Sequence, residues 1–200
     1  MNDFWTWAMP YMIKYTFLFF IVLVLSALEV QIEGRDGWNK NLPTWKRNNK
    51  IYSFLMGGKQ LTGYLFYMLI FIFLFLHFPF LNGLEWTIQA EIETLFIFFL
   101  FSVFWDFLWF VLNPYYGVRR LKKQYVWWHK KWILNIPLDY PLGLLTALVI
   151  SLFDFPEGLI KFVLAFGIFS LITIVVIIIN EIIRKDPKYE EKHLYYFEKK

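Results

Sequence analysis

Asp106 is the residue in this sequence whose surroundings most need a chemical explanation. It is the only charged residue between Glu93 and Arg119, and it lies in an apolar, aromatic run long enough to cross a lipid bilayer. A carboxylate at that depth costs free energy unless it has a partner, and such residues usually have a function. We therefore predict that Asp106 is a catalytic residue. The alternative is a structural ion pair or hydrogen bond with another helix.

The residues at helical spacing from Asp106 predict a polar face that points into the protein. Ser102, Trp109 and Asn113 fall on this face, whereas Phe, Leu and Val fill the others. We predict that Trp109 and Asn113 contact a ligand. Asn113 precedes Pro114, so satisfying the free backbone groups at the helix end is an equally good explanation of that residue.

Further ionisable residues are expected near the same membrane boundary. Glu29 and Glu33 are one helical turn apart, Asp139 opens a later apolar segment, and His129 lies in a basic, Trp-rich stretch. We predict His129 as a second catalytic residue and the three acids as ligand-binding residues. Solvation at the lipid headgroups is the alternative for Glu29, Glu33 and His129.

Carboxylates with one imidazole can bind a divalent metal, act as general acid and base, or relay protons. A divalent metal is therefore a possible cofactor, with Glu29, Glu33, Asp106 and His129 as its candidate ligands. The sequence contains no HExxH, GxSxG, phosphate-binding Gly-rich loop, paired ExxH or DDxxD motif. The pattern therefore assigns no reaction.

The composition indicates that the membrane is the solvent of this chain. Of its 200 residues, 58% are hydrophobic and 23% aromatic, which leaves too little polar surface for a water-soluble domain. There is no cysteine, so thiolate metal sites are excluded. The net charge of +4 is grouped in short segments, which favours contact with lipid headgroups and argues against nucleic acid as a partner.

The hydropathy pattern predicts an all-α integral membrane helical bundle that forms a single domain over residues 1–200. The segment 134–153 is the hardest to assign, because its continuous apolar part begins only at about Pro141. About five transmembrane helices are expected at residues 11–31, 61–80, 94–113, 134–153 and 158–183, with inner loops at 32–60 and 114–133 and a soluble tail at 184–200.

The distribution of basic residues predicts the orientation of these helices. With five spans, eighteen of the 20 Lys and Arg fall on one side, and only Lys14 and Lys161 on the other. The positive-inside rule then places the amino terminus outside and the carboxyl terminus in the cytoplasm, with the protein in the inner membrane. Without a crossing at 134–153, the bias would weaken.

Two segments, EVQIEGRDGWNKNLPTW and FWDFLWFVLNPYYG, resemble a family of small prokaryotic multi-pass membrane proteins that has no established function. The resemblance covers most of the chain and implies the membrane fold, but it assigns no catalytic residue.

The sequence favours a multi-pass protein with a cytoplasm-facing polar pocket, centred on Asp106, that binds or processes an amphipathic or lipid-like ligand. One alternative is a component of a transporter or channel. The other is a non-catalytic subunit of a membrane complex. Membrane lipids are the expected partners, together with a second copy of the chain or a membrane partner subunit.

Overall fold

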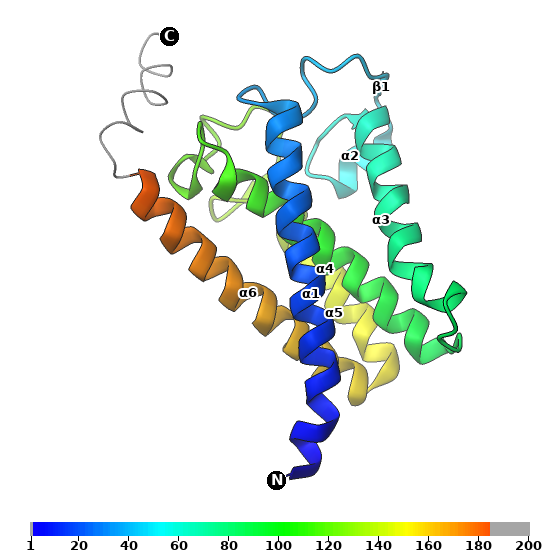
Figure 1. Cartoon of the computed structure of the whole chain (residues 1–200). Coiled ribbons are helices and arrows are strands. Elements are labelled where there is room, and N and C mark those ends of the chain that lie inside the picture. The colour runs from blue at the N-terminus through cyan, green and yellow to red at the C-terminus, as the bar shows by residue number, and fades with distance from the viewer. Residues whose placement is uncertain (1, 185–200) are drawn as a thin grey trace.

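The computed structural model describes residues 2–184 and is mostly helical (Figure 1). Apart from Arg184, the predicted soluble tail at 184–200 lies outside this range. Within it the α-helices are α1 (Asn2–Glu33), α2 (Lys50–Leu55), α3 (Gly63–Leu81), α4 (Ile88–Leu112), α5 (Asp139–Ser151) and α6 (Glu157–Arg184). Short 3-10 turns occupy Val118–Arg120 and Leu152–Asp154, and two antiparallel pairs join β1 (Lys46–Arg47) to β2 (Leu61–Thr62) and β3 (Trp132–Ile133) to β4 (Ile136–Pro137).

Four helices, α1, α3, α4 and α6, are long and apolar enough to cross a membrane. This supports the prediction of a multi-pass helical membrane protein. The remaining predicted span, 134–153, differs in the structure. Its first part forms the β3–β4 hairpin, and α5 has only 13 residues, about 20 Å against a hydrocarbon core of about 30 Å. The length of α5 alone therefore does not show that a fifth segment crosses the membrane.

Local capping explains why the helices begin where they do. The hydroxyl of Thr87 accepts a hydrogen bond from the backbone N–H of Ala90, so α4 begins at Ile88, before the predicted start at residue 94. Thr62 caps α3 in the same way through Leu65. Helix α1 is also longer than predicted, since it starts at residue 2 and not near residue 11.

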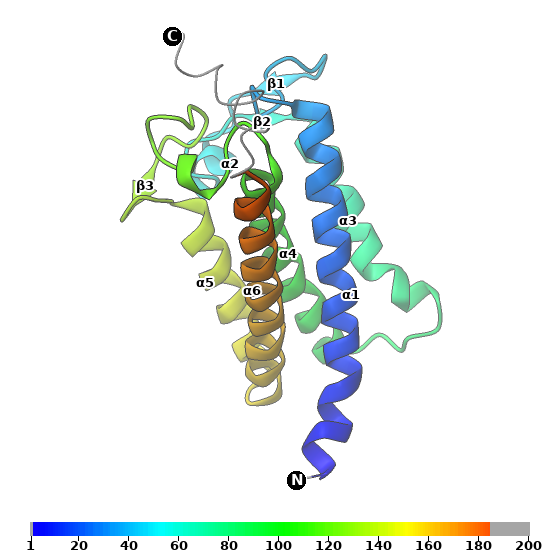
Figure 2. The same cartoon turned by 60° about the vertical axis from the view of Figure 1, so that its left-hand side comes forward.

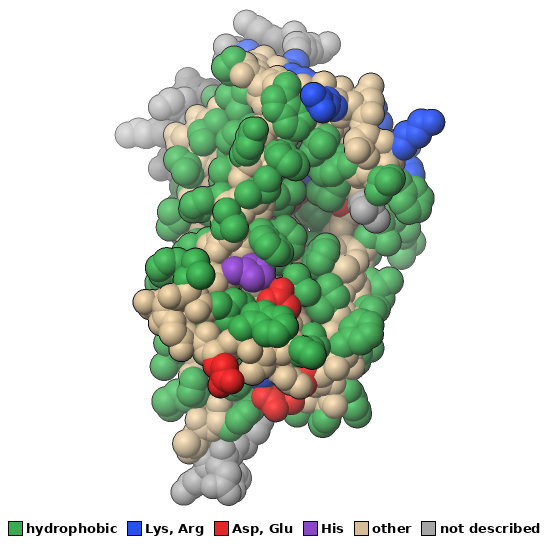
Figure 3. Space-filling view, turned by 90° about the vertical axis from the view of Figure 1, so that its right-hand side faces the viewer, with side chains coloured by type: hydrophobic (Ala, Val, Ile, Leu, Met, Phe, Trp, Pro, Cys, Tyr) green, Lys and Arg blue, Asp and Glu red, His purple; other side chains and the backbone are tan. Residues whose placement is uncertain are grey.

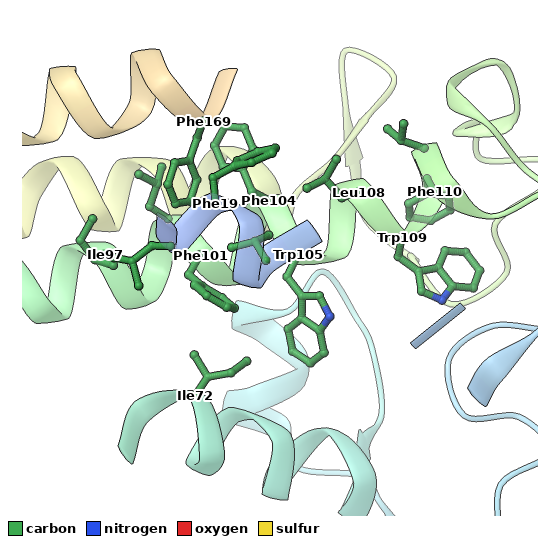
Figure 4. Packing of buried hydrophobic residues seen from close by; sticks show 14 of the residues in the cluster. Phe19, Ile72, Ile97, Phe101, Phe104, Trp105, Leu108, Trp109, Phe110 and Phe169 are labelled. Atoms are coloured by element: carbon green, nitrogen blue, oxygen red, sulfur yellow. The ribbon is translucent and has the colours of Figure 1, made fainter. Parts of the chain in front are cut away.

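Helix α4 is the centre of the bundle, because it packs against α1, α3, α5 and α6. Where α1, α4 and α6 meet, Phe169 lies edge-on to Phe19 and Phe104, with ring centroids 5.4 and 5.3 Å away (Figure 4). Helix α3 lies to one side of this bundle (Figure 1). One face of α4 is thus committed to aromatic packing, and the face that carries Asp106 remains for polar partners.

The loops that follow α1 and α4 fold over one end of the bundle, opposite the amino terminus (Figure 2). The Glu33 carboxylate accepts hydrogen bonds from the backbone N–H groups of Trp38 and Asn39, at 3.0 and 2.8 Å, which orders the first loop. Trp128 from the second loop stacks on Phe110 of α4, with ring centroids 5.7 Å apart. These loops close the bundle at the level of Asp106.

Candidate functional site: a buried ion-pair cluster

Asp106 is compensated by three side chains from other parts of the chain. The Lys59 ammonium lies 3.0 Å from its Oδ1, and the Tyr140 hydroxyl donates to its Oδ2 at 2.6 Å. The Nε2 of His129 is 3.5 Å from the same Oδ2. The free-energy cost of a carboxylate in the last two turns of the apolar helix α4 is thus offset by an ion pair and a short hydrogen bond.

Asp139, at the start of α5, joins the same cluster. Its Oδ2 is 2.8 Å from the Lys59 ammonium, and its Oδ1 is 3.1 Å from Nδ1 of His129. Lys59 and His129 therefore each lie between the two carboxylates. We call Lys59, Asp106, His129, Asp139 and Tyr140 the ion-pair cluster.

A tight turn places Lys59 in this cluster. Gly57 and Gly58 both have positive φ, and the Gly57 carbonyl accepts hydrogen bonds from the backbone N–H groups of Lys130 and Lys131. A Cβ atom on Gly58 would lie 2.7 Å from the Cβ of Lys130, so only glycine allows the two segments to approach this closely. The turn thereby delivers Lys59 to the segment that carries His129.

The buried ammonium of Lys59 is held in its charged form. Burial disfavours the charge, but Asp106 and Asp139 outweigh that effect and raise the pKa of Lys59 above its usual value. The ammonium also lies 4.6 Å from the ring centroid of Trp38, which adds a cation–π contact. Burial, Asp106 and Asp139 likewise raise the pKa of Tyr52, so its phenol keeps the proton.

Two cavities meet at Asp106. The larger, of about 260 Å³, lies between α2, α3, α4 and α5. Figure 3 shows a hollow in the surface of the face that it presents, with an acidic side chain visible inside. Its lining combines Tyr52, Lys59, Ser102, Asp106, Asp139, Tyr140 and Thr146 with Met56, Leu69, Phe98, Phe99, Val103, Leu142 and Gly143. We call it the α4–α5 cavity. The smaller, of about 40 Å³, lies on the α1 side of Asp106 and has room for a few water molecules.

The structure brings Asp106, His129 and Asp139 together, and one ligand atom from each lies within 4.8 Å of the others. Their oxygen and nitrogen donors suit a divalent cation, but the Lys59 ammonium already lies between the two carboxylates and pairs with both. Glu29 and Glu33 do not belong to this group. A metal cofactor stays a prediction, and so do the catalytic roles of Asp106 and His129.

The other predicted ligand-binding residues separate into two sets. Glu29, Glu33 and Trp109 line the small cavity with Asp106. Asn113 does not, because its amide donates to the Gly34 carbonyl and its Oδ1 accepts from the backbone N–H of Tyr115. The backbone explanation of Asn113 therefore matches its observed contacts.

Two members of the ion-pair cluster, Lys59 and Tyr140, were not among the predicted site residues. The sequence signal for Lys59 is a lone basic residue directly after Gly57 and Gly58, between two apolar segments. Tyr140 follows Asp139, one step into α5. His129 is 2% exposed and lines neither cavity, so it reaches a ligand only through the two carboxylates that it contacts.

No family model, curated protein or solved structure matches this chain. The comparisons thus identify no family, and the resemblance to small prokaryotic membrane proteins stays a prediction.

Proposed function

We propose that this protein binds an amphipathic, lipid-like ligand in the α4–α5 cavity, with the polar group of the ligand at Asp106. The observation that carries the proposal is the composition of that cavity. One end holds Asp106, Asp139 and Tyr140, and the remaining wall is largely aromatic and aliphatic. A charged end joined to an apolar wall is complementary to a molecule with a headgroup and a chain.

The volume of the cavity supports a ligand that is only partly enclosed. At about 260 Å³ it lies just below the range of about 300–1,000 Å³ that is typical of small-molecule sites. A headgroup with the first part of a chain fits this space, and the rest of the chain would extend into the bilayer. Membrane lipids are thus the nearest source of such a ligand.

Within this proposal, Asp106 is the group that touches the ligand, and His129 is a positioning residue. The carboxylate of Asp106 lines both cavities, and its side chain is 25% exposed. His129 holds Asp139 through Nδ1 and faces Asp106 through Nε2, an atom with no hydrogen-bond partner among the described residues. If the ligand is also processed, Asp106 is the charged group that contacts it.

We further propose that five segments of the chain cross the inner membrane, with the cluster on the cytoplasmic side. The described helices alternate in direction along the bundle, and α5 runs back from the looped end toward the start of α6 (Figure 2). The basic loops after α1 and α4 lie at the end opposite the amino terminus. That arrangement supports an external amino terminus by the positive-inside rule.

A cavity-filling substitution tests the proposed function. Thr146→Phe places a ring in the α4–α5 cavity, whereas Ile174→Phe adds a ring to an α6 residue that is 53% exposed and lines no cavity described here. Native mass spectrometry of each protein, purified in a neutral detergent, reports the amphipathic molecules that remain bound. We expect Thr146→Phe to lose adducts that the parent and Ile174→Phe retain. Equal adducts in all three proteins would contradict the proposal.

A further inference from the structure

The charge that the α4–α5 cavity presents to a ligand is negative. Lys59 is fully buried, with a side-chain exposure of 0%, and Asp139 retains only 6%. Asp106 retains 25%. Although Lys59 also lines the cavity, its ammonium has no exposed surface, so the charged group that a ligand in the cavity contacts is the Asp106 carboxylate.

The net charge of the groups around the cavity is also negative. Two carboxylates surround one ammonium, and a protonated His129 would bring the cluster only to neutrality. A phosphate or carboxylate headgroup at Asp106 would therefore meet a carboxylate of like charge in a medium of low dielectric constant.

The uncharged polar groups of the cavity are available as hydrogen-bond acceptors. The hydroxyls of Ser102 and Thr146 donate to the carbonyls of Phe98 and Leu142 in their own helices, which leaves their oxygen lone pairs to accept. The Tyr52 hydroxyl of α2 is buried and has no hydrogen-bond partner among the residues described, so it can either donate or accept. Along the α4 and α5 walls, the hydroxyl oxygens of Ser102 and Thr146 are thus acceptors.

Resting on the proposed function, we infer that the polar group of the ligand is a cation with N–H donors, so that the protein binds long-chain amines or lipids that carry a primary ammonium. The ammonium would pair with Asp106 and donate to the nearby hydroxyl oxygens. The chain would lie along Phe98, Phe99 and Leu142, which line the same cavity.

Three probes with the same chain and different headgroups test this inference: dodecylamine, dodecanol and dodecyl phosphate. At pH 7 the first is a cation, the second is neutral and the third is an anion. Each is titrated into the full-length protein in a neutral detergent, and bound copies are counted by native mass spectrometry. We expect dodecylamine to bind roughly tenfold more tightly than dodecyl phosphate, the size of one charge-assisted contact. Asp106→Asn should remove this preference.

The outcomes separate the headgroup inference from the proposed function. If the parent binds all three probes equally, or prefers the phosphate or the alcohol, the inference is wrong. The order of affinities of the three probes is measured on the parent protein, so it does not depend on whether Asp106→Asn folds. If Thr146→Phe nevertheless weakens all three relative to Ile174→Phe, amphiphile binding in the cavity stands. If Thr146→Phe weakens none of them, the proposed function itself fails.

Discussion

Lys59 sets the electrostatic balance of the buried site at the level of single residues. Its ammonium is shared between Asp106 and Asp139, at 3.0 and 2.8 Å, with no exposure to solvent. Removing the charge of one partner in a buried ion pair usually costs more than the pair contributes, since the other partner is left unpaired. Lys59 therefore has a stronger effect on stability than its place in a loop suggests.

Replacing Lys59 tests this dependence. Lys59→Met leaves two carboxylates without their cation, so we expect the free energy of unfolding to fall by about 3–5 kcal/mol. A thermal unfolding curve of the detergent-purified protein would show this as a lower midpoint. Lys59→Met/Asp139→Asn removes one of the two orphaned charges and should recover part of the loss.

The control for this prediction is Lys123→Met, because Lys123 is an exposed lysine in the loop after α4. It should leave the unfolding midpoint nearly unchanged. Equal midpoints for Lys59→Met and Lys123→Met would show that the ion-pair cluster does not stabilise the fold.

At the scale of elements, α4 carries two acids that tie it to its neighbours, Glu93 near the start of the helix and Asp106 near its end. Besides Asp106, Glu93 lies 2.7 Å from the ammonium of Lys14 in α1 and 3.5 Å from that of Lys161 in α6. The Tyr15 hydroxyl also donates to Glu93, at 2.9 Å. Because α4 already starts at Ile88, Glu93 lies inside the bundle and is 6% exposed. Glu93 thus fastens α1 and α6 to α4.

Substitution of Glu93 should loosen this junction. Glu93→Gln keeps the shape but weakens two ion pairs and a hydrogen bond, so we expect a loss of about 2 kcal/mol in the free energy of unfolding. Glu85→Gln, at an exposed position before α4, is the matched control. The comparison uses thermal unfolding midpoints in the same detergent. Indistinguishable midpoints would argue that aromatic packing alone holds α1 and α6 on α4.

At the scale of the whole molecule, the two ends of the bundle differ in character. The loops that carry most of the basic residues cover one end, and the amino terminus lies at the other (Figures 1 and 2). Helix α5 is short, but it lies between elements that run in the opposite direction. The orientation proposed for the protein therefore depends on whether α5 and its flanking residues complete a crossing.

Reporter fusions test that orientation. We expect a reporter placed after Lys200 to be cytoplasmic and one placed before Met1 to be external, because an odd number of crossings separates the two ends. The measurement is the activity of a pair of reporters that are active on opposite sides of the membrane. If both ends report the same side, the segment 134–153 does not cross.

The sequence alone determined the properties that depend on local composition. Continuous apolar runs identified a helical membrane protein, and the helices predicted at 61–80 and 158–183 agree with α3 and α6 to within two residues at each end. The cost of a charge in hydrocarbon pointed to Asp106, with His129 and Asp139 near the same boundary. These inferences rest on helical periodicity and on transfer free energies. Both depend only on which residues lie near one another along the chain.

The tertiary structure decided which groups compensate which charges. Lys59 is 47 residues from Asp106 in the sequence, and it reaches the cluster only because the Gly57–Gly58 turn docks against Lys130 and Lys131. The β3–β4 hairpin replaced part of a predicted span, since pairing between strands competes with helix formation there. Ion pairs and cavities between distant segments depend on how the elements pack. For that reason the partner of Asp106, and the sign of the charge that faces the cavity, emerged only from the folded molecule.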